Sequence, residues 1–258
     1  MSKLFRVLFV LLMALSLPLT TAFAHNDHGK HHDKDILVTL GDSVPFGFSP
    51  HRNNERPAHY AFPYLMGDKA DLKVYNFAVP IWKTEDLLAA LDENKKFRQA
   101  VRKADYVTVN IGGIDFLEIL QEANAESRGD SKKFIQLLEQ KLAKTDVFDD
   151  LREILKEIRS LTDAPVVLYN IYNPFQSKDP FHKVAEHYLP QINDAYEDLA
   201  DDYKNIELAD AYKAFDDNQA KFVIRGDAHP TKAGHVKLAK IGLRALDLDH
   251  ARHHHHHH

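Results

Sequence analysis

The sequence predicts an α/β fold, a three-layer α/β/α sandwich with about five parallel strands. Short apolar runs rich in β-branched residues recur along the chain, and amphipathic stretches with helical spacing separate them. Strands that alternate with helices are typically parallel and are joined by right-handed crossovers. No internal repeat or long Gly/Ser-rich linker marks a second domain. The five apolar runs are residues 36–40, 74–78, 106–111, 165–171 and 205–208.

The expected helices are recognised by apolar residues three and four positions apart. Residues 134–142 and 151–158 show this spacing with charges on the opposite face, and residues 238–245 show it near the C-terminus. Between the strands, residues 122–130 are polar and include Asn, Ser and Gly, so we expect an exposed loop there.

The N-terminal segment, residues 1–24, has the pattern of a secretory signal peptide. Lys3 and Arg6 provide a basic start, residues 7–19 an apolar stretch, and residues 22–24 (Ala-Phe-Ala) a small-x-small cleavage site. The apolar stretch is too short to span a membrane comfortably, and no later run approaches about 18 apolar residues. We therefore expect a secreted protein, extracellular or periplasmic, without a stable membrane anchor.

Two further segments are set apart from the expected domain, which is residues 35–250. Residues 25–34 form a leader rich in His and Asp, and the spacing of its side chains matches no closed structural zinc site, so no metal is assigned to it. Residues 253–258 are six consecutive histidines, which indicate an affinity tag.

Composition narrows the classes of partner. Without Lys3 and Arg6, 31 basic residues stand against 38 acidic ones, a formal charge of −7. Nucleic acid or an anionic membrane would require a basic face, so neither is expected as a partner. The chain has no cysteine, so neither a disulfide nor a lipid attached through a cysteine can form.

Ser43 is the strongest candidate for a reactive side chain. It ends the tripeptide Gly41-Asp42-Ser43, directly after the apolar run 36–40, where ligands bind in open α/β sheets. A serine hydroxyl is a weak nucleophile until a base takes its proton, so the chemistry also requires a histidine and a group that orients it. The alternative is that Ser43 only caps a turn or a helix.

His229 is the strongest candidate for that base. It lies in residues 227–230 (Asp-Ala-His-Pro), on a loop before a helix expected to begin near Thr231 or Lys232. A catalytic histidine needs a partner on its second ring nitrogen, and Asp227 is the nearest acid in sequence. We therefore expect Asp227 to orient His229; the alternative is that Asp227 merely caps the following turn.

Four segments, taken in order, resemble the GDSL/SGNH hydrolase family. Residues 41–43 match its first block, whose serine is the nucleophile, and residues 76–80 resemble the second. Residues 110–115 resemble the third block and residues 227–230 the fifth, while residues 172–175 resemble a segment common in bacterial members. The resemblance implies a flavodoxin-like sandwich and ester hydrolysis through an acyl-enzyme, with neither metal nor organic cofactor.

The chain departs from the family pattern where the oxyanion is bound. Ile81 stands where the family has a glycine whose backbone N–H binds the oxyanion, and Ile114 where it has an asparagine amide. The family acid usually lies at the position of Gly226, one residue before Asp227. The N–H of Ser43 remains as a third donor. Loss of one donor costs about 2.7–4 kcal/mol, so weakened activity is expected.

Two functional hypotheses follow. The first is a secreted serine hydrolase that cleaves carboxylic esters, from small molecules or lipids, with Ser43, His229 and Asp227 as its catalytic residues. The second is a non-catalytic protein on the same fold that binds an acyl chain or another ligand, because apolar Ile81 and Ile114 can line a pocket without stabilising an oxyanion. Aromatic residues near the first two segments either line an acyl pocket or pack in the core: Phe46, Phe48, Tyr60, Phe62 and Trp82.

Overall fold

A parallel sheet of five strands forms the middle layer of the computed structural model, which describes residues 33–249. The strand order is β2-β1-β3-β4-β5, and every neighbouring pair is parallel. This doubly wound order is flavodoxin-like, and it confirms the predicted α/β/α sandwich. The strands are β1 (Ile36–Gly41), β2 (Lys73–Asn76), β3 (Tyr106–Asn110), β4 (Val166–Tyr169) and β5 (Ile206–Ala209).

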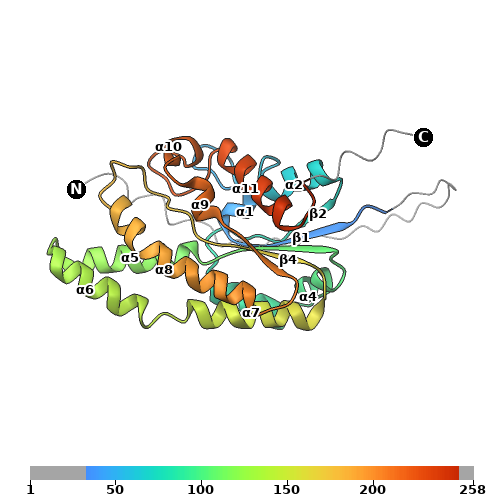
Figure 1. Ribbon diagram of the computed structural model, residues 1–258, viewed down its shortest axis with the longest axis horizontal. Helices are drawn as coiled ribbons and strands as arrows, with labels where there is room; N and C mark the ends of the chain where they lie inside the picture. The colour runs from blue at the N-terminus through green and yellow to red at the C-terminus, as the bar shows by residue number, and fades with distance from the viewer. Residues whose placement is uncertain (1–32, 250–258) are drawn as a thin grey trace. The chain divides into compact units, whose positions relative to one another are not determined.

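Helices cover both faces of this sheet (Figure 1). They are α1 (Ser43–Phe46), α2 (Phe62–Ala70), α3 (Thr84–Glu93), α4 (Lys95–Arg102), α5 (Gly113–Ser127), α6 (Ser131–Leu142), α7 (Val147–Leu161), α8 (His182–Asp201), α9 (Ala211–Phe215), α10 (Gln219–Phe222) and α11 (Lys232–Ala245). One face carries α2, α9, α10 and α11, and the other carries α3, α4, α5, α7 and α8. Helix α6 pairs with α5 and extends that second layer.

The strands divide their side chains between two apolar clusters, as a strand's period of two requires. In β1, Leu37 packs against α2 and α11, whereas Val38 and Leu40 face the opposite helical layer, and all three are fully buried. Full burial of one such side chain is worth about 1.5–3 kcal/mol. Thr39 also faces inward, and its hydroxyl lies 2.9 Å from that of Thr108 on β3. Each buried hydroxyl is thereby satisfied by the other.

One expected loop is wrong. Residues 122–127 continue α5, and only residues 128–130 form a turn, with Arg128 at φ 53° and Gly129 at φ 87°. Most polar residues of this stretch occupy the exposed face of the helix, while Ala123 and Ser127 are buried on the other face. Lys141 of α6 forms ion pairs with two of the exposed glutamates of α5. Polarity here indicates a solvated helix face.

The start of α11 agrees with the sequence prediction. Thr231 is its N-cap, and its hydroxyl accepts a hydrogen bond from the N–H of Gly234 at 3.1 Å, so the helix begins at Lys232. Pro230 precedes the cap and cannot itself donate to the helix. His229 therefore lies on the loop before α11, at the same end of the sheet as Ser43.

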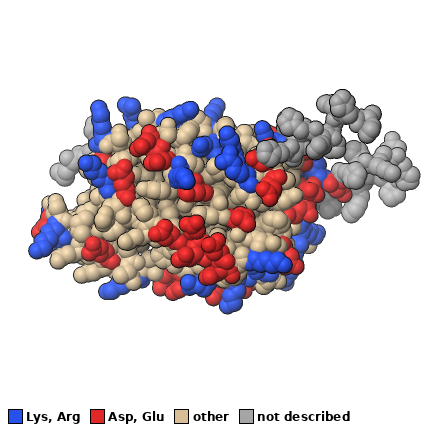
Figure 2. Space-filling view, viewed as in Figure 1, with Lys and Arg blue, Asp and Glu red and all other residues tan. Residues whose placement is uncertain are grey.

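Several predictions concern residues outside the described range. The signal peptide (1–24), nearly all of the leader (25–34) and the tag (253–258) fall there, and the domain boundaries 35–250 stay predictions. Within residues 33–249, no helix is long and apolar enough to cross a membrane. On the face in Figure 2, acidic side chains gather near the middle and basic ones lie mainly toward the edges. The expected absence of a nucleic-acid partner also stays a prediction.

Candidate active site

Ser43 lies directly beyond the carboxyl end of β1, beside the point where the strand order reverses. This switch point is where doubly wound sheets bind ligands. Gly41 allows β1 and β3 to approach closely at this point, because a Cβ at Gly41 would lie 2.0 Å from the carbonyl oxygen of Asn110. Asp42 then caps α1 by accepting a hydrogen bond from the N–H of Val44 at 2.9 Å. Ser43 is thus the first residue of the short helix α1.

A hairpin of residues 222–231 presents the histidine and its acid. The N–H of Ile224 donates to the carbonyl of His229 at 2.9 Å, and the N–H of Asp227 donates back to the carbonyl of Ile224 at 3.1 Å. The second bond closes a turn in which Gly226 has φ 76°, a conformation that favours glycine. The turn explains why this position carries glycine rather than the acid usual in the family.

The structure brings the three predicted catalytic side chains together. His229 Nε2 lies 2.9 Å from Ser43 Oγ, and His229 Nδ1 lies 2.5 Å from Asp227 Oδ1. The same carboxylate oxygen accepts the backbone N–H of His229 at 2.8 Å. Alternate residues of the hairpin point to one side, so an acid two positions before the histidine reaches its ring. The arrangement has the connectivity of a Ser-His-Asp triad.

The Asp227 carboxyl remains ionised to a lower pH than usual. Burial opposes its ionisation, but the hydrogen bond and positive charge of the His229 ring and the N–H groups of His229 and Ala228 outweigh burial and lower its pKa. A carboxylate that stays charged can stabilise the imidazolium that forms when His229 takes a proton.

Two residues support the His229 loop in ways that the sequence did not indicate. The Tyr172 hydroxyl donates to the carbonyl of Ala228 at 2.7 Å. The Phe48 ring lies 4.7 Å from the His229 ring, centroid to centroid. The resemblance of residues 172–175 to a family segment was the available signal for Tyr172, whereas nothing in the sequence distinguished Phe48 from a core phenylalanine.

Ile81 occupies the third position of a turn and holds a glycine-like backbone. The N–H of Trp82 donates to the carbonyl of Val79 at 3.3 Å, with Pro80 at the second position and Ile81 at φ 65°. Proline at the second position of such a turn commonly precedes a residue with positive φ. The Ile81 side chain is 71% exposed and points away from the protein interior. Its backbone therefore adopts the conformation that the family glycine would provide.

Ile114 lies in the first turn of α5, half-buried. Its side chain has no hydrogen-bond donor, so this position supplies no amide to an oxyanion. The N-cap before it is Gly112 at φ 104°, where a Cβ would lie 2.2 Å from the Tyr196 hydroxyl. The helix start is thus fixed by close packing.

Two carboxyls near Ser43 are kept largely out of water. Burial raises the pKa of Asp42 to about 7, although the N–H of Val44 and the charge of His229 lower it. Burial likewise raises the pKa of Asp115 to about 6, opposed by hydrogen bonds from Thr84. Perturbed acids gather at functional sites, but neither carboxyl contacts the Ser43 hydroxyl.

The aromatic residues near the first two segments do not form a shared pocket. Phe46 and Phe62 are buried in the core, and Trp82 packs against Phe97 with ring centroids 5.6 Å apart. Tyr60 lies over His235, whose pKa burial lowers to about 3. Among residues 33–249, no group of three or more His, Asp or Glu side chains is arranged to hold a metal ion.

The fold is that of a hydrolase of the doubly wound α/β class, and the site holds a hydrogen-bonded Ser-His-Asp arrangement. The sequence model of the GDSL-like lipase/acylhydrolase family matches residues 39–237. The chain therefore belongs to the GDSL-like lipase/acylhydrolase family, as its four segments suggested. A related protein of Bacillus subtilis (strain 168), the uncharacterized YpmR, is 26% identical over 231 residues, which cover 86% of this chain and 85% of that protein.

Solved structures share the fold. An extracellular lipase from Streptomyces rimosus superposes with a TM-score of 0.64 at 19% identity, covering 82% of this chain and 99% of the lipase. A phospholipase A1 from Streptomyces albidoflavus NA297 gives a TM-score of 0.65 at 15% identity, with the same coverage of each chain. At these identities the comparison establishes the SGNH hydrolase fold.

Proposed function

We propose that the protein is an exported serine esterase that hydrolyses carboxylic esters through an acyl-enzyme. The observation that carries the proposal is the hydrogen-bonded chain from Ser43 Oγ through the His229 ring to Asp227. Family membership supports the reaction class, since lipases and esterases share this fold.

In the proposed mechanism each of the three side chains has one role. His229 Nε2 takes the proton of the Ser43 hydroxyl as Oγ attacks the ester carbonyl carbon, and the tetrahedral intermediate expels the alcohol, which receives that proton. A water then repeats the sequence against the acyl-enzyme, and the acid leaves with Ser43 restored. Asp227 holds the ring in the tautomer that keeps Nε2 free to accept, and it stabilises the imidazolium.

In this proposal, backbone N–H groups donate the hydrogen bonds that stabilise the oxyanion. Among residues 33–249, no hydrogen-bond acceptor is paired with the N–H of Ser43 or the N–H of Ile81, so both are free to donate to the intermediate. Ile114 adds nothing. Loss of one such donor lowers kcat about 10²–10³-fold. A slow esterase is therefore expected.

The direct test combines turnover with labelling of the nucleophile. Folded protein is incubated with p-nitrophenyl butyrate, and separately with a fluorophosphonate probe followed by peptide mapping. Hydrolysis and a phosphonate adduct at Ser43, both lost in Ser43→Ala, are expected. A folded protein that neither turns over ester nor labels at Ser43 sinks the proposal.

The non-catalytic alternative draws on one observation, the apolar Ile114 at the amide position. A protein of that kind would bind a fatty acid without turning over its ester. The same assay separates the two functions, because fluorophosphonates require an activated serine and fatty-acid binding does not.

The proposal of export rests on residues 1–24 alone. Expression of the full chain in a bacterial host, followed by N-terminal sequencing of the released protein, should find His25 as the first residue. Retention of an intact Met1 in the cytoplasm would refute export while leaving the esterase proposal untouched.

A further inference from the structure

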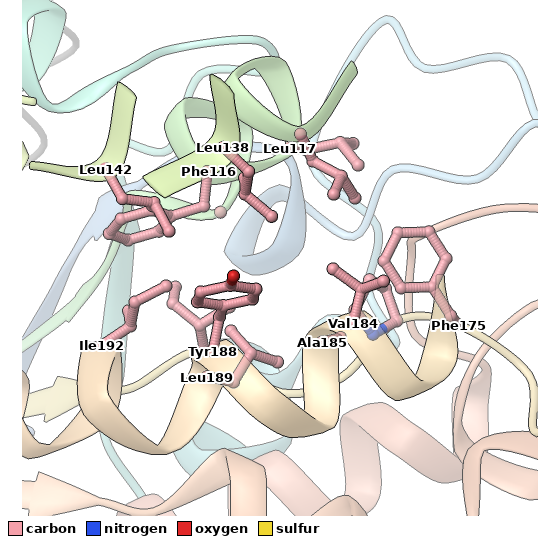
Figure 3. A pocket seen from close by; sticks show the side chains of 14 residues that line it. Phe116, Leu117, Leu138, Leu142, Phe175, Val184, Ala185, Tyr188, Leu189 and Ile192 are labelled. Atoms are coloured by element: carbon pink, nitrogen blue, oxygen red, sulfur yellow. The ribbon is translucent and has the colours of Figure 1, made fainter. Parts of the chain in front are cut away.

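A cavity of about 70 Å³ lies between the hairpin of α5 and α6 and the helix α8, outside the catalytic residues described above. Figure 3 shows two rows of side chains that face each other across it. One row comes from α5 and α6 and includes Phe116, Leu117 and Leu138. The other comes from α8 and the loop before it and includes Ala185 and Phe175.

The chemistry of the cavity wall is uniform. Of its lining side chains, only Tyr188 carries a polar group, and the hydroxyl of Tyr188 donates to Glu139 at 3.2 Å. No charged side chain lines the cavity. An occupant with a polar or charged group would leave that group without a partner, at a cost of several kcal/mol in an apolar setting. The wall therefore selects a hydrocarbon.

The cavity borders the segment that carries the nucleophile. Gly113, the first residue of α5, belongs to its wall, and a Cβ at Gly113 would meet only the Asp42 carboxylate, at 4.0 Å. Gly113 also directly precedes Ile114, the oxyanion position. On the other side, Phe175 belongs to the same loop as Tyr172, which is hydrogen-bonded to the His229 loop. The wall thus includes the residue before the oxyanion position and a residue of the loop that holds the His229 loop.

We propose that the cavity under the α5–α6 hairpin receives the acyl chain of the ester substrate. This inference rests on the proposed esterase function and names the part of the substrate that the site selects. An unbranched alkyl chain has no group to satisfy and fits between two parallel rows of apolar side chains. The ester carbonyl then remains at Ser43, with the chain running past Gly113, where the absence of a side chain leaves room.

The volume sets the length of chain that fits. An apolar cavity of about 150 Å³ holds benzene, so about 70 Å³ accommodates roughly three carbon atoms. Together with the carbons between Ser43 and the cavity, this favours acyl chains of medium length. Palmitate would have to separate α6 from α8, which are joined by the bond between Tyr188 and Glu139.

The first experiment changes the volume and measures chain-length preference. Ala185 is buried on α8, and Ala185→Leu fills about the whole space, whereas Leu117→Ala enlarges it. Because one methylene in a hydrophobic pocket changes kcat/KM about 10–200-fold, the octanoate-to-acetate ratio of kcat/KM should fall at least about tenfold in Ala185→Leu. In Leu117→Ala the optimum should shift toward longer chains. The matched control, Ala125→Leu on the exposed face of α5, should leave the ratio unchanged.

The second experiment separates this inference from catalysis. Displacement of a fluorescent fatty acid by octanoate is measured in Ser43→Ala, with and without Ala185→Leu. Octanoate binding that weakens about tenfold or more on filling supports the cavity even where the wild-type protein proves inactive. Equal binding in both proteins, or a chain-length ratio that Ala185→Leu and Ala125→Leu alter alike, overturns the proposal. Ester turnover that persists in either case leaves the esterase function standing.

Discussion

Two turns near Ser43 each require a positive φ at their third residue. One turn has glycine at that position and the other has isoleucine. In the turn that ends at Asp227, the third residue is Gly226 at φ 76°, with nothing within 4 Å of where a Cβ would stand. In the turn that ends at Trp82, the third residue is Ile81 at φ 65°. Of the six non-glycine residues with positive φ in the described chain, Ile81 alone is β-branched.

The difference shows how two parts of the site depart from the family: the residues proposed to transfer the proton and the residues proposed to bind the oxyanion. At Gly226 the glycine has displaced the usual acid, and the hairpin compensates because Asp227 reaches His229 from one residue further along. At Ile81 an isoleucine has displaced the usual glycine, and the backbone keeps its shape at a cost of about 1–2 kcal/mol for a left-handed residue. In the proposed mechanism, the residues that transfer the proton are therefore all present, while the oxyanion position at Ile81 is strained and Ile114 lacks a side-chain donor.

The largest expected effect comes from removing the charge of Asp227, the proposed hydrogen-bond partner of His229. Asp227→Asn keeps the size of the side chain but removes its charge and favours the wrong ring tautomer. We expect ester turnover to fall on the order of 10⁴-fold, as in a complete triad. Asp216→Asn, at an exposed carboxyl outside the site, is the control. A loss below about threefold, at unchanged fold stability, would reject the role of Asp227.

The next prediction concerns a second carboxyl near Ser43, that of Asp42, and the pH dependence of the protein's stability. Asp42 is buried and its pKa is raised to about 7, so the folded protein retains a proton that the unfolded chain releases near pH 4. Stability should therefore fall as pH rises from about 4 to 7, by about 1.4 kcal/mol per unit and about 4 kcal/mol in all. Asp42→Asn preserves the cap of α1 and should abolish that fall.

Urea unfolding at several pH values tests this prediction. The free energy of unfolding of Asp42→Asn, minus that of the wild type, should increase toward neutral pH. Asp92→Asn, an exposed carboxyl on α3, should follow the wild type. Parallel curves for the wild type and Asp42→Asn would show that Asp42 ionises freely in the folded protein.

The part of the site proposed to bind the oxyanion can be repaired at one position. Ile114→Asn places an amide donor in the first turn of α5, and kcat for a short ester should rise about 10²–10³-fold. Ile114→Leu changes the shape of the side chain without adding a donor and should give no such gain. Similar kcat values for the two variants would mean that the missing amide does not limit the rate.

The sequence predicted the sheet well because strand signals in this protein are strong and local. The central strands β1, β3 and β4 are mostly apolar and rich in β-branched residues, and all five strands lie within two residues of the expected ends. The loop expected at residues 122–130 failed because the pattern there depends on a partner. Ala123 is buried in a cluster with Leu138 of α6, and one sequence segment contains no sign of that contact.

The site was predictable in its side chains and less so in its backbone. Ser43 and His229 followed from segment order, Asp227 followed from its being the nearest acid in sequence to His229, and the structure brings the three side chains together. The conformation of Ile81 did not follow, because a β-branched residue is rarely found at positive φ. Pro80 was the available signal, since proline at the second position of a turn accommodates such a neighbour. The cavity under the α5–α6 hairpin depends on three helices at once and left no pattern in any one of them.

The smallest expected effect is on the free energy of unfolding, and it compares glycine and a side chain at the third position of each turn. Ile81→Gly relieves about 1–2 kcal/mol of left-handed strain but adds about 0.4–1 kcal/mol of unfolded-chain entropy, so a net gain of about 0.5–1 kcal/mol is expected. Gly226→Ala reverses both terms, and because open space surrounds Gly226, no steric clash adds to the expected net loss of about 0.5–1 kcal/mol. Urea unfolding checks both predictions, because the midpoint should rise in Ile81→Gly and fall in Gly226→Ala. Since Ile81 already presents its N–H in the glycine-like conformation, Ile81→Gly should change kcat far less than Ile114→Asn does. Destabilisation by Ile81→Gly would show that its side chain makes contacts worth more than the strain.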